Sequence, residues 1–118
     1  MIVGVDHVQL AIPAGAEEEA VRFYGGLLGL TQVPKPAELA GRGGCWFQGD
    51  GVRVHLGVDD PFVPARKAHP GFVVRGLDGL VERMAVAGIA VDEAEVLDRH
   101  RRVHVHDPFG NRIELIEY

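Results

Sequence analysis

Hydrophobic and polar residues alternate along several short segments of the chain, which is the spacing expected of β-strands with one buried face. Residues 5–12 show this pattern first and end at a Pro-Ala-Gly turn. In residues 16–28 the apolar positions recur at helical spacing behind an acidic first turn, and Gly29 is expected to end that helix. The rest of the first half is predicted as a short strand at 30–33, a loop at 34–44, and a hairpin of strands 45–48 and 52–58.

The second half of the chain repeats this order of elements after a proline-containing segment at residues 59–67. The sequence GVRVHL, beginning at Gly51, aligns with GNRIEL, beginning at Gly110, because 110 − 51 and 114 − 55 both equal 59. His55 and Glu114 are therefore counterparts. The elements expected in this half are a strand at 69–75, a helix at 77–87, a strand at 89–97, and hairpin strands at 103–106 and 111–117.

Each half of the chain therefore follows a β-α-β-β-β order, and we predict an α+β fold. With 118 residues, the chain fits a single domain, with module one at about 1–58, a linker at about 59–67 and module two at about 68–118. One face of each module's sheet cannot be buried by that module alone. We therefore expect the two modules to pair so that they share a core or enclose a cleft.

Four residues that can bind a metal ion lie at matching places in the two halves. His7 opens the first strand of the first half and His69 opens the corresponding strand of the second, while His55 and Glu114 lie on the fourth strands. Period-two alternation places His7, His55 and Glu114 opposite the apolar side chains that are expected to pack under the helices. We predict that these residues face the cleft.

Neutral imidazoles and one carboxylate suit Fe, Mn, Ni, Co or Zn, and these donors do not choose among the ions. A single strand histidine is more often structural than a metal ligand, but unrelated structural histidines have no reason to occupy symmetric positions. The repeat therefore favours one divalent metal ion, bound by His7, His55, His69 and Glu114. Such an ion can polarise a carbonyl or enolate oxygen or activate a bound water.

Further polar residues near these positions are candidates for binding a substrate. Gln9 shares the face of His7, and Arg66 precedes His69, where it can bind a carboxylate or phosphate or belong to a solvated linker. His104 shares one face of its strand with His106, and this face can line the cleft as a general acid or base or point outward. The single cysteine, Cys45, is expected to be a buried strand thiol.

Charge and composition exclude several classes of function. A formal net charge of −5 provides no basic surface for nucleic acid. No apolar run approaches the roughly 20 residues that span a bilayer, and no signal peptide is recognisable. The lone cysteine agrees with a reducing compartment. We therefore expect a cytoplasmic protein that binds a small molecule, without a membrane or nucleic-acid partner.

Several motifs of the chain resemble the vicinal oxygen chelate superfamily, which includes glyoxalase I, fosfomycin-resistance enzymes, extradiol dioxygenases and bleomycin-resistance proteins. The resemblance covers essentially the whole chain, and the hairpin DPFGNRIELIE at residues 107–117 is its most specific part. The other motifs that carry it are DHVQLAI, RFYGGLLGL, VRVHLGV and AHPGFVV.

The resemblance implies a divalent metal ion bound at His7, His55, His69 and Glu114, with His55 and Glu114 as the predicted catalytic residues. In glyoxalase I the position of His55 is typically Glu. Fosfomycin-resistance and extradiol enzymes use two His and one Glu, which map to His7, His69 and Glu114 and leave His55 nearby. The resemblance also implies that the two modules pair into a curved mixed sheet around a cleft. It further implies a homodimer, with each cleft formed either within one chain or across two.

Two functions from different classes are therefore expected. The first is a small metal-dependent enzyme that chelates an oxygen-rich substrate and stabilises an oxyanion or enolate, as a lyase, isomerase, dioxygenase or transferase. The alternative is a metal-free protein that sequesters a drug or metabolite, as bleomycin-resistance proteins do. A degenerate regulatory or structural member of the superfamily is a third possibility. Retention of potential ligands at all four positions favours the enzyme.

Overall fold

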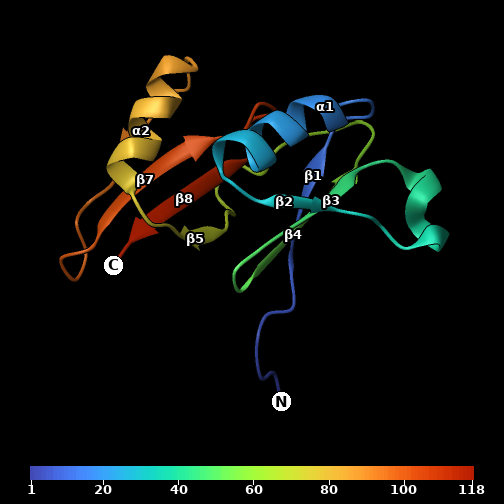
Figure 1. Cartoon of the computed structure of the whole chain (residues 1–118), viewed down its shortest axis with the longest axis horizontal. Coiled ribbons are helices and arrows are strands. Elements are labelled where there is room, and N and C mark those ends of the chain that lie inside the picture. The colour runs from blue at the N-terminus through green and yellow to red at the C-terminus, as the bar shows by residue number, and fades with distance from the viewer. The chain divides into compact units, whose positions relative to one another are not determined.

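The backbone of residues 1–118, described by a computed structural model, divides into the units Met1–Val63 and Pro64–Tyr118. Each unit contains a four-stranded mixed sheet and a helical segment (Figure 1). The predicted α+β fold with two β-α-β-β-β modules is confirmed. The boundary between the units lies inside the segment 59–67 that the sequence suggested as a linker.

The first unit has the strand order β1-β4-β3-β2. Strand β1 runs parallel to β4, so the chain must cross over between them, whereas β3 pairs with both neighbours in the antiparallel direction. The elements of this unit are β1 (Val8–Ile12), α1 (Glu17–Ala20), η1 (Val21–Leu27), β2 (Thr31–Val33), η2 (Ala37–Arg42), β3 (Cys45–Gly49) and β4 (Val52–Val58).

The second unit repeats this topology with the strand order β5-β8-β7-β6. Strand β5 is parallel to β8, and the other pairs are antiparallel. The helix α2 lies against β8. The elements of this unit are β5 (Gly71–Val73), α2 (Leu77–Val86), β6 (Asp92–Glu93), β7 (Arg101–His106) and β8 (Arg112–Glu117).

The predicted helix at 16–28 is observed as α1 followed directly by η1, in which the helix widens. The amide of Leu28 donates to the carbonyl of Phe23, five residues back, with an N–O distance of 3.0 Å. Gly29 then adopts φ +75°, a left-handed conformation that glycine reaches without strain. The predicted end of the helix is thus confirmed, and its physical cause is the backbone freedom of this glycine.

Each unit buries one apolar layer between its sheet and its helix. In the first unit, Tyr24 of η1 packs on Phe47 of β3 with ring centroids 5.8 Å apart. The alternation expected on β7 and β8 is observed, since their apolar side chains are buried and Glu114 points to the opposite face. The fully buried apolar residues of the second unit are Leu77, Met84, Val103, Val105, Ile113 and Leu115.

A predicted strand and a predicted loop differ from the structure. The strand expected at 89–97 is reduced to β6, because the amide of Ile89 bonds to the carbonyl of Met84 and so closes the end of α2. After β6, Asp98 and Arg99 adopt positive φ and form a turn. The loop expected at 34–44 contains the short helix η2.

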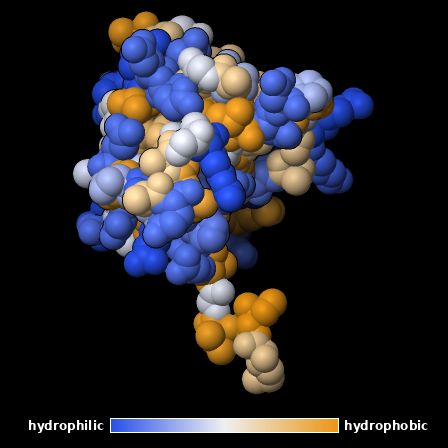
Figure 2. All heavy atoms as spheres, turned by 90° about the vertical axis from the view of Figure 1, so that its right-hand side faces the viewer, coloured by the Kyte–Doolittle hydropathy of each residue, from blue (hydrophilic) through white to orange (hydrophobic).

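The first strand of each unit is shorter than the sequence pattern suggested. Strand β1 begins at Val8, and β5 begins after Pro70, which has no amide hydrogen for the ladder. His7 and His69 therefore lie just before these strands rather than within them. The apolar side chains of residues 1–5 are exposed and form the tail that protrudes in Figure 2.

Candidate functional site

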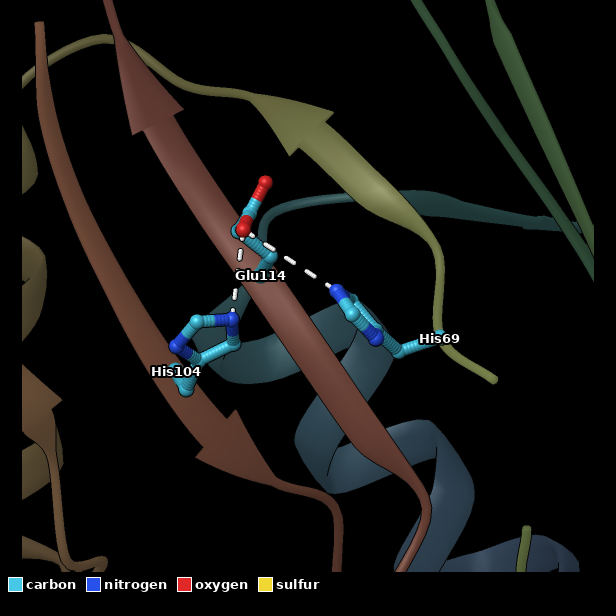
Figure 3. A group of neighbouring side chains, drawn as sticks. All are labelled: His69, His104 and Glu114. Carbon is cyan, nitrogen blue, oxygen red and sulfur yellow. Dashed lines mark ion pairs between the residues drawn. The ribbon is translucent and has the colours of Figure 1, made fainter. Parts of the chain in front are cut away.

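The pairing of β7 with β8 places two polar side chains of the second unit opposite each other. His104 faces Glu114 in the antiparallel register, and Gly71 of β5 faces Glu114 from the other side. His69 lies two residues before Gly71 and completes a group that we call the His-His-Glu cluster: His69, His104 and Glu114 (Figure 3). His104 lies on β7, Glu114 on β8, and His69 in the segment just before β5.

The potential ligand atoms of the His-His-Glu cluster all lie within 4.8 Å of one another. Oε1 of Glu114 lies 3.2 Å from Nε2 of His104 and 3.9 Å from Nε2 of His69 (Figure 3). The side chains are only partly accessible, at 26% for His69, 15% for His104 and 12% for Glu114. The cluster is thus partly shielded from bulk water.

A backbone contact fixes the form of His69 that is able to bind a metal. Its Nδ1 lies 2.7 Å from the carbonyl oxygen of Lys67, which can only accept a hydrogen bond. Nδ1 must therefore donate, and in the neutral ring Nε2 keeps its lone pair and points toward Glu114. A backbone carbonyl that orients an imidazole in this way is a common feature of metal-bound histidines.

Burial lowers the pKa of His104 below its usual value of 6.5, and the positive charge of Arg112 acts in the same direction. The negative charge of Glu114 opposes this shift without reversing it. His104 is therefore mainly neutral near pH 7, which is the form that coordinates a metal ion.

The His-His-Glu cluster fits a first-row divalent metal ion by its donors and by their spacing. Bonds of about 2.1 Å in a tetrahedral arrangement place neighbouring ligand atoms roughly 3.4 Å apart. The separations of 3.2 and 3.9 Å around Glu114 are close to this value. Because the lone pair of His69 Nε2 faces an anionic oxygen, a cation between these two atoms would relieve their repulsion.

Arg102 also binds the carboxylate of the cluster. Its Nη1 donates to Oε1 of Glu114 at 2.8 Å, and its Nε donates to the backbone carbonyl of Glu95 at 3.2 Å. Sequence reasoning missed this residue. The signal was present, because Arg102 is two residues before His104 and therefore shares its face of β7.

The first unit holds the equivalent residues in a different arrangement. His55 of β4 lies between Gln9 of β1 and Trp46 of β3, just as Glu114 lies between Gly71 and His104. The ring of His55 stacks on Trp46 with centroids 3.7 Å apart and an interplanar angle of 1°. His7 stacks on the other side of His55, at 4.2 Å and 20°. We call His7, His55 and Trp46 the aromatic stack.

Stacking affects whether His7 and His55 can bind the same metal ion. A metal ion binds an imidazole in the plane of its ring, so two nearly parallel rings present lone pairs that do not converge on one ion. Burial lowers the pKa of His55, with a further contribution from His7. The structure therefore shows His7 and His55 as stacked rings. Their roles as metal ligands stay predictions.

Asp6 links the aromatic stack to a nearby cation. Its Oδ2 lies 2.9 Å from Nδ1 of His7, and its Oδ1 accepts from Nη1 of Arg53 at 3.2 Å. The hydrogen bond from His7 lowers the pKa of Asp6. Sequence reasoning did not identify Asp6, because an exposed acidic residue before a strand gives no specific signal.

A cavity of about 620 Å³ adjoins the aromatic stack within the first unit. The predicted substrate-binding residue Gln9 lines it, together with the stack, Arg53 and an apolar wall that includes Pro34 and Leu39. This volume is typical of small-molecule pockets, which are largely apolar with a few polar groups. Arg66, the other predicted binding residue outside the cluster, is exposed in the segment before His69.

No helix of the structure is both long enough and apolar enough to cross a membrane.

Solved structures of similar proteins share this fold over nearly the whole chain. A glyoxalase family protein from Bacillus anthracis is 46% identical, with 99% of this chain and 96% of that chain covered and a TM-score of 0.93. A glyoxalase/dioxygenase from Nostoc punctiforme is 25% identical, with 97% and 90% covered and a TM-score of 0.78. A fosfomycin resistance protein from Listeria monocytogenes is 17% identical, with 100% and 95% covered and a TM-score of 0.79, and this likeness shows the fold alone.

A comparison with curated proteins gives no match to the chain. The family model described as the Glyoxalase/Bleomycin resistance protein/Dioxygenase superfamily matches residues 4–115, which include the aromatic stack, the His-His-Glu cluster and both sheets except the end of β8. By this match and by its two β-α-β-β-β modules, the chain belongs to the glyoxalase/bleomycin resistance protein/dioxygenase superfamily.

Proposed function

We propose that the protein is a divalent-metal-dependent enzyme that acts on a small, oxygen-rich substrate. The observation that carries this proposal is the convergence of His69, His104 and Glu114, whose ligand atoms lie within 4.8 Å of one another. Members of the superfamily typically use a divalent metal ion, which supports the same assignment. The ion is expected to be Fe, Mn, Ni, Co or Zn, as the nitrogen and oxygen donors suggest.

Each residue of the cluster has a distinct role in this proposal. Glu114 supplies the negative charge that favours a cation, and Lys67 orients His69 through its backbone carbonyl. His104 adds a second neutral nitrogen from β7. A metal ion held here would act as a Lewis acid toward substrate oxygens, because three protein ligands leave coordination positions open.

The reaction class stays open among lyase, isomerase, dioxygenase and transferase. Structural relatives include a fosfomycin resistance protein and a lactoylglutathione lyase from Agrobacterium tumefaciens, and the latter is 20% identical with a TM-score of 0.68. The activities in these names belong to the relatives. At 17% and 20% identity, these likenesses show the fold alone and select neither a substrate nor a reaction for this chain.

Metal analysis of untagged protein tests the proposal directly. The wild type is titrated with Mn²⁺, Ni²⁺ or Zn²⁺ and its bound metal measured by plasma mass spectrometry after gel filtration. We expect near-stoichiometric metal in the wild type and loss in His69→Ala, His104→Ala and Glu114→Gln. His106→Ala is the matched control, because His106 is exposed on the same strand as His104. A wild type that binds none of these ions contradicts the proposal.

A second function, binding of a small molecule without metal, is favoured by a separate observation. The cavity beside the aromatic stack has a volume of about 620 Å³ and is lined by residues of the first unit. Trp46 is the only tryptophan of the chain, so its fluorescence reports on this cavity. Ligand-induced quenching that survives complete chelation of metals would support sequestration. Quenching that requires metal would support the enzyme.

A further inference from the structure

Arg102 and Glu114 form a largely buried ion pair within the proposed metal site. The bond between Nη1 and Oε1 is 2.8 Å long, and the side chains are only 20% and 12% exposed. Charge-assisted hydrogen bonds of this kind are among the stronger ones in proteins, more so when water is partly excluded. Glu114 is therefore already paired with a cation when the metal ion is absent.

The oxygen that Arg102 holds is the one nearest to the two histidines. Oε1 of Glu114 accepts from Arg102 and is also the atom 3.2 Å from His104 and 3.9 Å from His69. A metal ion bound by these three residues would compete with Arg102 for this oxygen. The two cations would also repel each other at short range, since the partly buried site screens charge poorly.

A second hydrogen bond keeps the guanidinium beside the cluster even if Nη1 leaves Glu114. Nε of Arg102 donates to the carbonyl of Glu95, in the segment between β6 and β7. The corresponding place in the first unit is held by Gly44, since Trp46 and His104 are equivalent and each lies two residues further along the chain. The first unit therefore has no cation at the position that Arg102 holds in the second unit.

The charges around the cluster favour an anion once a metal ion is bound. Arg102 lies 2.8 Å from Glu114, and Arg112 lies on β8 two residues before Glu114, so two guanidinium groups accompany the single carboxylate of the cluster. An arginine offers a planar set of donors that matches the oxygens of a carboxylate, phosphate or phosphonate. This local positive charge contrasts with the net charge of −5 of the chain.

We propose that Arg102 exchanges partners: it neutralises Glu114 in the metal-free protein and binds an anionic group of the substrate when metal occupies the cluster. The substrate class is then a small oxyanion that carries a second oxygen able to reach the metal. This inference rests on the proposed metal site. It makes Arg102 a determinant both of metal affinity and of substrate specificity.

Metal affinity tests the first half of this inference. Isothermal titration with Mn²⁺ and Ni²⁺ is compared for the wild type, Arg102→Gln and Arg102→Lys. We expect Arg102→Gln to bind metal at least about tenfold more tightly, because it removes the competing charge. Arg102→Lys should stay near the wild type, since it keeps the charge. If Arg102→Gln binds metal as tightly as the wild type or more weakly, Arg102 does not compete with the metal ion for Glu114.

Arg101→Gln is the matched control for these titrations. Arg101 is the neighbouring residue but pairs with Asp78 and Glu93, away from the cluster. Its removal should leave metal affinity unchanged. Circular dichroism of every variant checks the fold, and Arg102→Lys keeps the test informative if Arg102→Gln is unstable, because a lysine that fails to restore wild-type affinity contradicts a role for charge.

Anion binding tests the second half of the inference, that Arg102 binds an anionic group of the substrate when metal occupies the cluster. Inorganic phosphate and glycolate are titrated separately into protein with and without saturating Mn²⁺, which distinguishes a phosphate-type from a carboxylate-type substrate. We expect metal to strengthen binding of one anion at least about tenfold in the wild type and much less in Arg102→Gln. The same gain in both proteins would show that the metal alone binds the anion, and would overturn the role of Arg102.

Failure of the inference and failure of the proposed function give different results. If the wild type binds metal and Arg102→Gln binds it equally, only the inference fails. If neither the wild type nor Arg102→Gln binds metal although both are folded, the metal-dependent function fails and the inference fails with it. If the wild type binds metal and Arg102→Gln binds it more tightly, both the proposed function and the competition are supported.

Discussion

Cys45 illustrates how burial decides the chemistry of one side chain. The residue is 3% exposed at the start of β3, and burial raises the pKa of its thiol to about 11, with a smaller contribution from the negative charge of Glu17. The thiolate is the reactive form of cysteine. Its low population near neutral pH makes Cys45 an inert core residue, as its place beside Trp46 and Phe47 suggested.

We predict that Cys45 in the native protein reacts with iodoacetamide at pH 8 far more slowly than in urea. At three pH units below its pKa, about one thiol in a thousand is ionised, whereas an unfolded cysteine has a pKa of about 8.5. Mass spectrometry of the alkylated fraction over time measures the difference. Comparable rates in the native and unfolded protein would contradict the buried thiol.

Acidic side chains connect helical elements to neighbouring segments in both units. Glu17 of α1 accepts a hydrogen bond from the amide of Gly44 at 2.9 Å, just before β3. Glu117 of β8 accepts from the amides of Gly76 and Leu77 at 2.6 and 3.2 Å, at the beginning of α2. A carboxylate at a helix N-terminus satisfies free amides and complements the helix dipole. Sequence periodicity did not reveal either contact.

Removal of the carboxylate at the start of α2 should destabilise the protein. We predict that Glu117→Ala lowers the free energy of unfolding by about 1 kcal/mol, the usual effect of losing a helix cap. Glu82→Ala, an exposed change on α2 itself, is the control and should have little effect. Urea denaturation followed by circular dichroism measures both, and equal stabilities would argue against the cap.

Glu17 should make stability depend on pH in the acid range. Its hydrogen bond from Gly44 holds its pKa below the usual value of 4.5. A depressed pKa contributes stability that is present above pH 4.5 and is lost as the pH falls through the folded value. We predict that Glu17→Gln loses less stability than the wild type between pH 5 and 2.5, as measured by urea midpoints at each pH. Parallel curves for the two proteins would exclude this contribution.

At the scale of the whole molecule, the two units share a topology but use their equivalent positions differently. The central β4 position carries His55, stacked on Trp46, whereas the same place on β8 carries Glu114, close to His104 and Arg102. The first unit therefore presents aromatic side chains beside a cavity, and the second unit presents the potential metal ligands of the His-His-Glu cluster. The homodimer and the pairing of the modules around a cleft stay predictions.

Metal content can determine whether the first unit contributes ligands, as the sequence predicted for His7 and His55. If the second unit alone binds the ion, His7→Ala and His55→Ala should retain wild-type metal content, and His104→Ala should lose it. If His7→Ala also loses metal, the first unit provides a ligand, as family resemblance implies. Plasma mass spectrometry on the three variants, purified in parallel, distinguishes these results.

Much of the fold could be predicted because it depends on local patterns. Period-two alternation located β3, β4, β7 and β8, and helical spacing with a closing glycine located α2 and the helix that ends at Gly29. Residues 89–97 were misassigned, because a β-rich composition does not show where the preceding helix is closed or where a turn begins. The offset of 59 identified His55 and Glu114 as counterparts, and the strand registers place them so.

The sequence by itself determined the superfamily, the repeated topology and the strand faces on which the polar residues lie, because these follow from spacing along the chain. Only the tertiary structure decided which of those residues meet. Register across β5, β8 and β7 brought His104 and Arg102 to Glu114, and stacking turned His55 toward Trp46. Such contacts depend on side-chain directions between strands distant in sequence, which no one-dimensional pattern specifies.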